Sequence, residues 1–310
     1  MEAPKRRPTS PVRWFRRRWV HLALGLLVAV LAASWAGQRA RQGVLDNLDA
    51  RLRASGAGAD ASLISVEAEQ LSALRAITFT RGIAEAVANS DPATINRIVT
   101  PLHANSDVPM VDVLRPDGQV LLAVRSKGAP RPVASRQGMP AIDQSMREAR
   151  GPRGGRFSEL VIFKSGPTFV TVGPLMEANT PVGVVLVMTP LADVLGRISQ
   201  QVGADLTAYT SNGVPIATTA ISDPPALDLN TARTLIGGGA IVMRYIHGDD
   251  REALGRLIVD HQPDAVLGVS LEDNSASTGN AVTLFAALGL LATVLILATF
   301  WARVANTERR

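Results

Sequence analysis

Histidine, serine and aspartate are the side chains from which this chain would have to build a hydrolytic site. Its central region has three histidines, His103, His247 and His261, together with many serines and aspartates. A catalytic triad is defined by geometry rather than by composition, and the chain has no G-x-S-x-G nucleophile elbow. Cysteine is absent, which excludes thiol catalysis, disulfide chemistry and thiolate zinc sites. We therefore predict that the chain is not an enzyme.

A metal site is the second chemistry to consider. The run His247-Gly248-Asp249-Asp250 places one imidazole beside two carboxylates, which are ligands for a divalent cation. Glycine and aspartate are also the ordinary residues of a solvated turn between two strands. The turn is the favoured interpretation, so we expect no metal and no cofactor.

Arginine-mediated binding of a small anion is the third chemistry. Alternation along VPMVDVL sets Met110, Asp112 and Leu114 on one face of a strand and Pro109, Val111 and Val113 on the other. If the second set is core, Asp112 shares a face that lines a pocket. A guanidinium binds a carboxylate or phosphate through two parallel hydrogen bonds. The ligand-binding candidates are Asp112, Arg125, Arg156, Phe169 and Thr171, each with the alternative of being a surface charge or a core residue.

Two charge-free apolar stretches position everything else. They run from Trp19 to Gly37 and from Ala281 to Trp301, and each has the length of a helix that crosses the hydrocarbon core. Arginine and lysine crowd residues 1–18 and recur in 302–310, and such flanks stay on the cytoplasmic side. We predict a two-pass protein of the cytoplasmic (inner) membrane with both termini cytoplasmic and a periplasmic, extracytoplasmic domain. The alternative for the first stretch is a signal peptide cleaved near Ser34-Trp35-Ala36.

The first apolar stretch carries small residues four apart. Gly25, Ala29 and Ala33 form one small-residue face, and Gly289 begins a less complete one in the second stretch. Such faces let transmembrane helices pack closely, which predicts a homodimer. Alanine is common in this chain, so chance is the alternative explanation.

The net charge of +5 belongs to the membrane flanks. The lead has seven basic residues against one acidic residue, and the tail has three against one. The region between them is therefore slightly acidic. With 4% aromatic residues it also lacks a stacking platform for bases, so nucleic-acid binding is excluded.

The elements that would position the candidate residues follow in a regular order. Apolar residues at helical spacing run from Val44 through Val87, although the pattern is interrupted at ASGAGA (54–59). Asp91-Pro92 predicts the start of a shorter helix. Residues 38–107 are therefore predicted to form a stalk helix and a short second helix. Residues 108–190 contain a hairpin with its turn at Arg115-Pro116-Asp117-Gly118 and three further strands, and 191–203 is a linking helix. Residues 204–272 begin with a second hairpin.

The second hairpin echoes the first. VDVLRPDGQVLLA and LTAYTSNGVPIAT place Gly118 and Gly213 in corresponding positions, and PVGVVLVMTP echoes AVLGVSLEDN with Gly183 and Gly268. The echoes predict two copies of one α+β module with separate antiparallel sheets. The alternative is that D-G and N-G hairpins are common in any β-rich domain.

This order resembles the double Cache sensor domains, the extracytoplasmic ligand-binding parts of bacterial transmembrane receptors. VDVLRPDGQVLLA and PVGVVLVMTPLADVLGRISQQVGADLTAYTSNGVPIATT carry the resemblance, which covers 38–280. It implies two PAS-like modules, with a small molecule bound in the membrane-distal one (108–190) and 204–272 as the membrane-proximal one.

The chain departs from that family in two respects. Amino-acid-binding members use a Tyr/Arg/Trp/Asp constellation, whereas the only tyrosines here are Tyr209 and Tyr245 and no tryptophan lies in the soluble region, which disfavours that ligand class. Only nine residues follow Trp301. Any kinase or cyclase output is therefore expected in a missing C-terminal part or in a cytoplasmic signalling partner.

The predicted function is a membrane-anchored sensor. It would bind a small, anionic ligand in the distal module, beneath the Gly/Pro-rich stretch from about Arg125 to Phe157, and transmit the signal across the membrane. The alternative is a membrane-tethered scaffold of an envelope complex that uses the same fold as a protein-binding surface.

Overall fold

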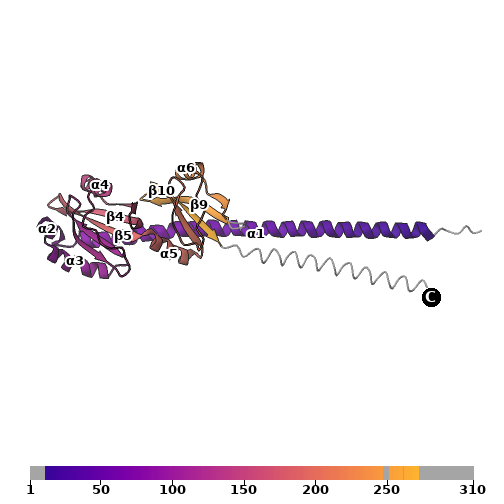
Figure 1. Cartoon of the computed structure of the whole chain (residues 1–310), viewed down its shortest axis with the longest axis horizontal. Coiled ribbons are helices and arrows are strands. Elements are labelled where there is room, and N and C mark those ends of the chain that lie inside the picture. Colours follow the sequence, from indigo (N-terminus) through magenta and orange to yellow (C-terminus); the bar gives the residue numbers. More distant parts are fainter. Residues whose placement is uncertain (1–10, 247–250, 261, 272–310) are drawn as a thin grey trace, which may run out of the picture. The chain divides into compact units, whose positions relative to one another are not determined.

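The computed structural model describes residues 11–246, 251–260 and 262–271 (Figure 1). By their contacts, residues 51–272 form one compact unit, and the first 50 residues belong to another. The predicted second apolar stretch, with Gly289, lies outside the described residues. The surroundings of Gly25, Ala29 and Ala33 are also not described, although the backbone there is helical. Within the described part of the chain, no helix meets the length and apolarity that crossing a membrane requires.

The stalk is a single helix, α1, from Pro11 to Thr78. It continues through ASGAGA without a break, although two glycines in a helix interior cost about 1 kcal/mol each relative to alanine. The prediction that it extends to Val87 is wrong. The chain turns at Gly82, whose φ of 88° only glycine adopts readily, and α2 (Ile83–Ala88) starts there.

The next helix, α3 (Pro92–Ala104), starts as predicted. The Asp91 carboxylate accepts hydrogen bonds from the backbone N–H groups of Ala93 and Thr94 at 3.1 and 3.2 Å, and Pro92 occupies the first helical position. Hydrogen bonding to the charged form lowers the pKa of the Asp91 carboxyl.

The distal sheet is antiparallel, with strand order β2-β1-β5-β4-β3. The predicted turn between β1 and β2 is present, since the Gly118 N–H donates to the Arg115 carbonyl at 3.0 Å. The distal module contains the strands β1 (Met110–Leu114), β2 (Val120–Arg125), β3 (Phe157–Phe163), β4 (Gly166–Glu177) and β5 (Thr180–Pro190) and the helix α4 (Pro140–Glu148).

The proximal sheet repeats this order as β7-β6-β10-β9-β8, so the prediction of two separate sheets is confirmed. The segment between the sheets is the helix α5, which ends at Gly203 in a left-handed conformation. The remaining elements are α5 (Leu191–Val202), β6 (Asp205–Tyr209), β7 (Pro215–Thr218), α6 (Leu229–Ile236), β8 (Val242–Tyr245), β9 (Arg251–Val259) and β10 (Gln262–Leu271).

Strand topology confirms both predicted echoes, and strand register adds a detail to the second one. Leu114 and Tyr209 each stand four residues before the glycine of their hairpin turn. Leu114 pairs with Val184, and Tyr209 pairs with Val266. Val184 therefore corresponds to Val266, so Gly183 and Gly268 do not correspond. The two strands do match each other, but aligning them by their glycines shifts the register.

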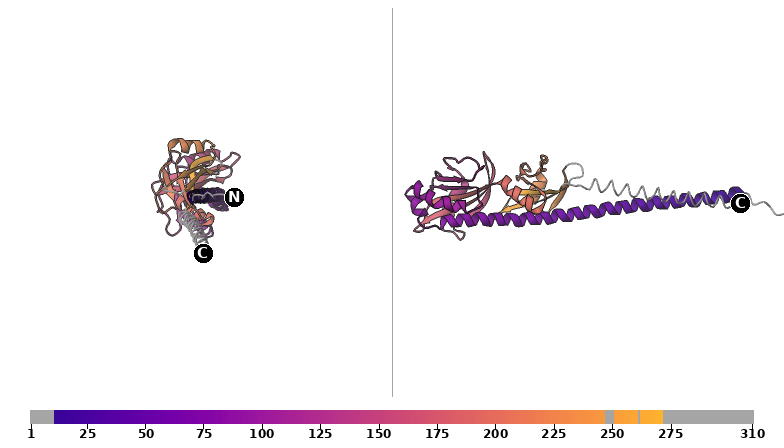
Figure 2. Two further views of the ribbon diagram at one scale, coloured as in Figure 1. Left: turned by 90° about the vertical axis from the view of Figure 1, so that its right-hand side faces the viewer. Right: turned by 90° about the horizontal axis from the view of Figure 1, so that it is seen from below.

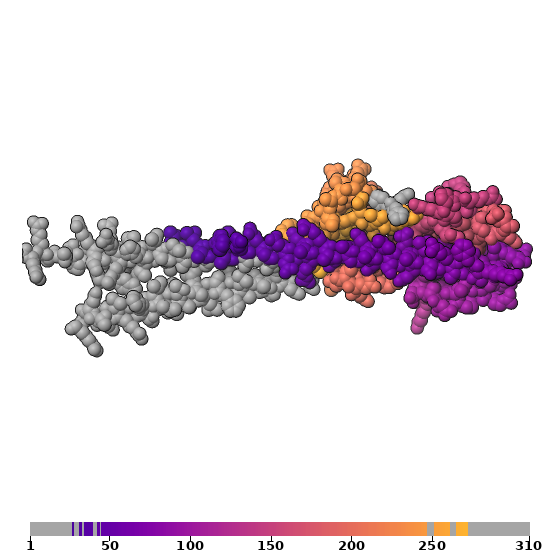
Figure 3. Space-filling model, turned by 180° about the vertical axis from the view of Figure 1, so that it is seen from behind, coloured from indigo at the N-terminus to yellow at the C-terminus, as the bar shows by residue number. Residues whose placement is uncertain are grey.

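Both faces of the distal sheet are buried. One face, which we call the helix face, packs Val111, Val113 and Val185 against Leu74 and Ile77 of α1 and against α2 and α3. The other, the lid face, is covered by residues 126–156, which we call the lid segment and which include α4. Residues 51–78 of α1 pass beside strands of both sheets, and their outer side is open to solvent (Figures 2 and 3).

This arrangement corrects the interpretation of β1. The alternation correctly assigned its residues to faces, but all five residues are buried, so Met110 and Leu114 belong to a core as much as Val111 and Val113 do. Asp112 is consequently a fully buried carboxylate within an apolar layer.

Candidate functional site

Asp112 is the centre of a buried charge cluster on the lid face. Its side chain is 0% exposed, and two arginines at 10% and 11% exposure pair with it. Arg125, at the end of β2, pairs with Oδ1, and Arg136 of the lid segment donates to Oδ2 from Nε and Nη2 at 3.1 and 3.0 Å. One carboxylate thus faces two guanidinium groups, and the cluster carries a net charge of +1.

The lid segment is fixed to the sheet beside this cluster. The Arg136 N–H donates to the Gly118 carbonyl at 2.8 Å, and Gln119 forms a β-bridge with Ser135. The Arg136 guanidinium also lies over the Phe163 ring, 4.4 Å from its centroid. Arg136 is therefore positioned by its backbone and by the aromatic ring as well as by Asp112.

Arg125 is less well satisfied than Arg136. Its Nη1 donates to the carbonyls of Val111 and Val124 at 3.1 and 2.9 Å. Its Nε and Nη2 are buried and find no hydrogen-bond acceptor among the described residues, although Nη2 lies within ion-pair distance of Asp112. Buried donors without acceptors are costly, so Arg125 presents an unused Nε–H group beside the net positive charge of the cluster.

Phe169 and Thr171 lie on the opposite face of the sheet from Asp112. Thr171 donates to Gln70 Oε1 at 2.7 Å, and Gln70 Nε2 donates to Thr189 at 2.8 Å. The Ser158 hydroxyl shares a further hydrogen bond of 2.9 Å with Thr171. This buried network ties α1 to three strands of the distal sheet. It does not place Thr171 or Phe169 with the charge cluster.

Arg156 is also separate from the cluster. Its guanidinium lies over the exposed Phe79 ring just beyond α1, 4.7 Å from the centroid. Burial lowers the pKa of Arg156, and the positive charge of Arg75 adds to that effect. Of the five candidates, the structure therefore brings together only Asp112 and Arg125. The third member of the cluster, Arg136, was not among the residues predicted from the sequence.

The proximal module has a buried charge cluster of its own. The Tyr209 hydroxyl donates to Glu252 Oε1 at 2.8 Å, while Arg244 donates to Glu252 Oε2 from Nε at 2.6 Å and to the Tyr209 oxygen from Nη2 at 2.7 Å. Arg244 also donates to the carbonyls of Pro225 and Ala226. Burial raises the pKa of the Glu252 carboxyl, with Arg244 acting in the opposite direction, and burial raises the pKa of Tyr209. Each polar atom here has a partner, which is typical of a buried cluster that stabilises the fold.

The other residues considered for chemistry lie mostly outside the described residues. His103 is buried on α3, while His247, Asp249, Asp250 and His261 lie outside the described residues. Among the residues that are described, no three His, Asp or Glu side chains are grouped as a metal would require.

Comparison with known proteins gives a likeness of fold. No protein-family model and no curated protein matches the chain. The sensor domain of the V. cholerae histidine kinase DctB is 9% identical with a TM-score of 0.49, and the match covers 74% of this chain and 98% of that one. The ligand-binding domain of the Campylobacter jejuni chemoreceptor Tlp3, solved with L-valine, is 11% identical with a TM-score of 0.48, covering 77% and 96%.

A domain of a sensory box/GGDEF family protein from Vibrio parahaemolyticus is 10% identical with a TM-score of 0.49, covering 78% of this chain and 99% of that one. The chain resembles sensor domains. These likenesses are of the same kind as the double Cache resemblance seen in the sequence, at TM-scores just below 0.5 and identities of 9–11%.

Proposed function

We propose that this chain is a membrane-anchored sensor whose distal module binds a small anionic ligand beneath the lid segment. The observation that carries the proposal is the Asp112 cluster, in which one buried carboxylate faces Arg125 and Arg136. A buried charge without a counter-charge is costly. An anionic group placed against Arg125 Nε would supply both the missing acceptor and the missing negative charge.

The cluster links ligand binding to movement because its parts come from different segments. Arg125 belongs to the sheet, whereas Arg136 belongs to the lid segment. A ligand that binds both arginines favours one position of the lid segment, and it shifts the equilibrium only by its differential affinity for the two positions. The Gln70 network attaches α1 to strands of the same sheet. A helix attached in this way is suited to carry the change toward the membrane.

Anion binding can be tested on the full chain in detergent micelles. Thermal unfolding is followed with acetate, succinate, citrate and inorganic phosphate as probes. A bound probe at about 100 times its dissociation constant stabilises the folded state by about 2.7 kcal/mol. We expect Arg136→Gln to abolish the stabilisation. Arg131→Gln, which removes an exposed arginine of the same lid segment, should leave it unchanged.

Two results would contradict anion binding. One is equal stabilisation of wild type and Arg136→Gln by every probe that binds. The other is the absence of stabilisation by all four probes, in which case a membrane-tethered scaffold becomes the better account.

The membrane anchoring rests on the two charge-free stretches and their basic flanks, and we propose that both ends are cytoplasmic and that the chain is dimeric. A cysteine introduced at Ser277 should react with a membrane-impermeant maleimide in intact cells, because it would lie outside the membrane. A cysteine at Thr9 should react only after lysis. Labelling of the Thr9 variant in intact cells would overturn the orientation.

A further inference from the structure

An ion pair joins the lid segment of the distal module to the proximal module. Arg153 of the lid segment donates from Nη1 to both carboxylate oxygens of Asp260, at 3.2 and 3.0 Å. Asp260 lies in the turn between β9 and β10, where Val259 pairs with Gln262. The two partners are 107 residues apart in the sequence, so the contact exists only because the two modules meet here.

Turn chemistry explains only part of this contact. Asp260 has a φ of 46°, and aspartate adopts this left-handed conformation more readily than most residues do. The turn does not require Arg153, however, which belongs to the other module. The Arg153 and Asp260 side chains are 59% and 23% exposed, so the ion pair can break and re-form at the surface. An exposed pair of this kind changes an equilibrium constant by up to about fivefold.

The turn end of the β9–β10 hairpin extends beyond the neighbouring strands. β8 pairs with β9 only as far as Leu254, and β6 pairs with β10 only from Val266. Nearer the turn, no strand within the described ranges pairs with the outer edge of β9 or β10. We call this part, residues 255–260 and 262–265, the hairpin end. It is held by the pairing of β9 with β10, and local opening is most frequent where few hydrogen bonds hold the backbone.

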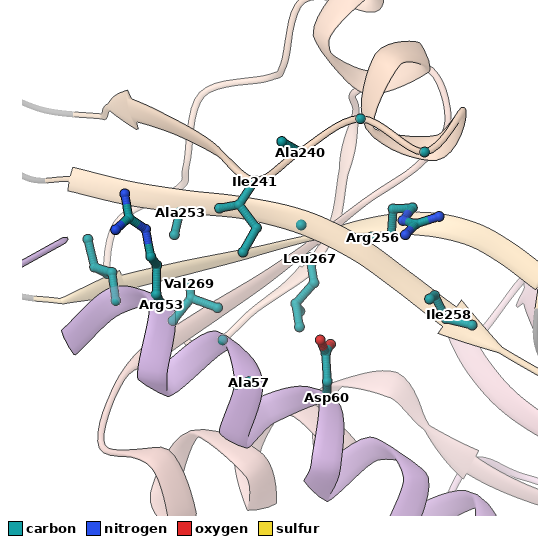
Figure 4. A pocket seen from close by; sticks show the side chains of 15 residues that line it. Arg53, Ala57, Asp60, Ala240, Ile241, Ala253, Arg256, Ile258, Leu267 and Val269 are labelled. Atoms are coloured by element: carbon teal, nitrogen blue, oxygen red, sulfur yellow. The ribbon is translucent and has the colours of Figure 1, made fainter. Parts of the chain in front are cut away.

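The hairpin end also has open space on its α1 side. A groove of about 440 Å³ lies between α1 and the proximal sheet (Figure 4). Gly56 and Ala57 of α1 and Gly255 of β9 are among the residues that line it, and a Cβ added at Gly255 would meet no atom within 4 Å. β9 can therefore shift relative to α1 near Gly255 without displacing a large side chain.

Two other arginines attach the lid segment to its own module. Arg136 donates to Asp112 on the lid face, and Arg150 donates from Nε to the Asn179 carbonyl, in the turn between β4 and β5, at 3.0 Å. The helix α4 lies between Arg136 and Arg153 and keeps much of the intervening chain rigid. A displacement of the lid segment at Arg136 can therefore reach the proximal module through Arg153.

We propose that the ion pair between Arg153 and Asp260 regulates the proximal module according to the position of the lid segment. While Arg136 is held at Asp112, Arg153 is positioned to keep the hairpin end closed. A shift of the lid segment weakens the ion pair, and the hairpin end then opens more often. For its natural trigger this inference rests on the proposed ligand site, but the ion pair itself can be tested without a ligand.

The contact gives the distal module a second route toward the membrane, separate from α1. β10 ends at Leu271, and the second apolar stretch begins at Ala281. The Gln70 network acts on α1, which contains the first apolar stretch, whereas the ion pair acts on the hairpin that precedes the second one. The distal module thereby acts on the chain segments that adjoin both stretches.

Hydrogen–deuterium exchange of the full chain in detergent micelles, followed by mass spectrometry of peptides from the hairpin end, tests the proposal. We expect Arg153→Gln to raise the exchange rate there by about two- to fivefold, because the ion pair no longer opposes opening. Asp260→Asn should have the same effect, since asparagine tolerates the left-handed conformation and lacks the charge. Arg136→Gln should raise the rate in the wild-type background and add nothing in the Arg153→Gln background.

Arg131→Gln is the matched control, because it removes an exposed arginine of the same lid segment, and it should leave exchange at the hairpin end unchanged. Unchanged exchange in Arg153→Gln or in Arg136→Gln overturns the proposal. An equal increase from Arg136→Gln in both backgrounds also overturns it, since general loosening of the distal module would produce that result. No anion is added in this experiment. If the ion pair passes the test while all four anions fail to bind, only the proposed ligand falls.

Discussion

Replacing Asp112 by alanine is expected to lower the free energy of unfolding by about 3–5 kcal/mol, because it leaves two buried guanidinium groups without their carboxylate. Urea denaturation of the full chain in detergent, followed by circular dichroism, measures the change. Asp107→Ala is the control, since Asp107 is exposed shortly before β1, and it should change the stability by less than about 0.5 kcal/mol.

Two further measurements test whether the unpaired arginines cause the loss of stability in Asp112→Ala. Acetate should stabilise Asp112→Ala more than wild type, because it can replace the missing carboxylate between Arg125 and Arg136. Replacing all three residues together by Leu, Met and Met should recover most of the lost stability, since a buried ionic group often exchanges for apolar residues at little cost. A loss below about 1 kcal/mol in Asp112→Ala would mean that the arginines are not left as unpaired buried charges, and the case for an anionic ligand would weaken with it.

Features set by neighbouring residues were predictable from the sequence. Asp91-Pro92 predicted a helix start because the aspartate caps backbone N–H groups only two and three residues away. The turn at Arg115–Gly118 was predictable because proline and glycine each restrict or permit particular backbone angles. The β1 alternation correctly placed Asp112 with Met110 and Leu114.

Features that depend on distant residues were not predictable. Arg136 is 24 residues from Asp112 in an irregular segment, and no local pattern distinguishes it from the other arginines there. Phe169 and Thr171 were grouped with Asp112 by strand proximity, but alternation along β4 sets them on the helix face, where Thr171 donates to Gln70, 101 residues away. The only available signal was the alternation of side chains between the two faces of each strand. To use it, one must know which residues of β4 pair with β5 and which of β5 pair with β1.

Register also shows why the two glycines of the second echo do not correspond, although their strands do. Gly183 and Gly268 each lie inside the closing strand of a module, but a larger residue at each position would clash with different neighbours. A Cβ at Gly183 would meet the Leu114 carbonyl oxygen of β1 at 2.5 Å and Val87 of α2 at 2.6 Å, whereas one at Gly268 would meet the Glu252 carboxyl carbon at 2.6 Å. Each glycine accommodates a long-range contact of its own module, so shared glycines are a poor guide to correspondence between the modules.

Gly268→Ala is expected to destabilise the proximal module by about 3 kcal/mol, because the new methyl group would occupy the place of the Glu252 carboxylate. Displacing that carboxylate removes the partner of Arg244 and of the Tyr209 hydroxyl, both of which are held in the buried cluster. Denaturation by urea, read by circular dichroism on the full chain, gives the loss. The matched control is Gly255→Ala in the adjacent strand, where the methyl group meets nothing within 4 Å and the change should stay within about 0.5 kcal/mol.

A double-mutant cycle identifies the cause of that loss. Glu252→Ala alone should also be costly, since it leaves Arg244 buried beside Tyr209 without a counter-charge. When Glu252→Ala is combined with Gly268→Ala, the added methyl group no longer meets a carboxylate, so the combined cost should fall below the sum of the separate costs by at least about 1 kcal/mol. Strictly additive costs would show that Gly268 matters for a reason unrelated to Glu252, such as strain in β10 itself. The coupling therefore decides whether the glycine is there to make room for the charge cluster.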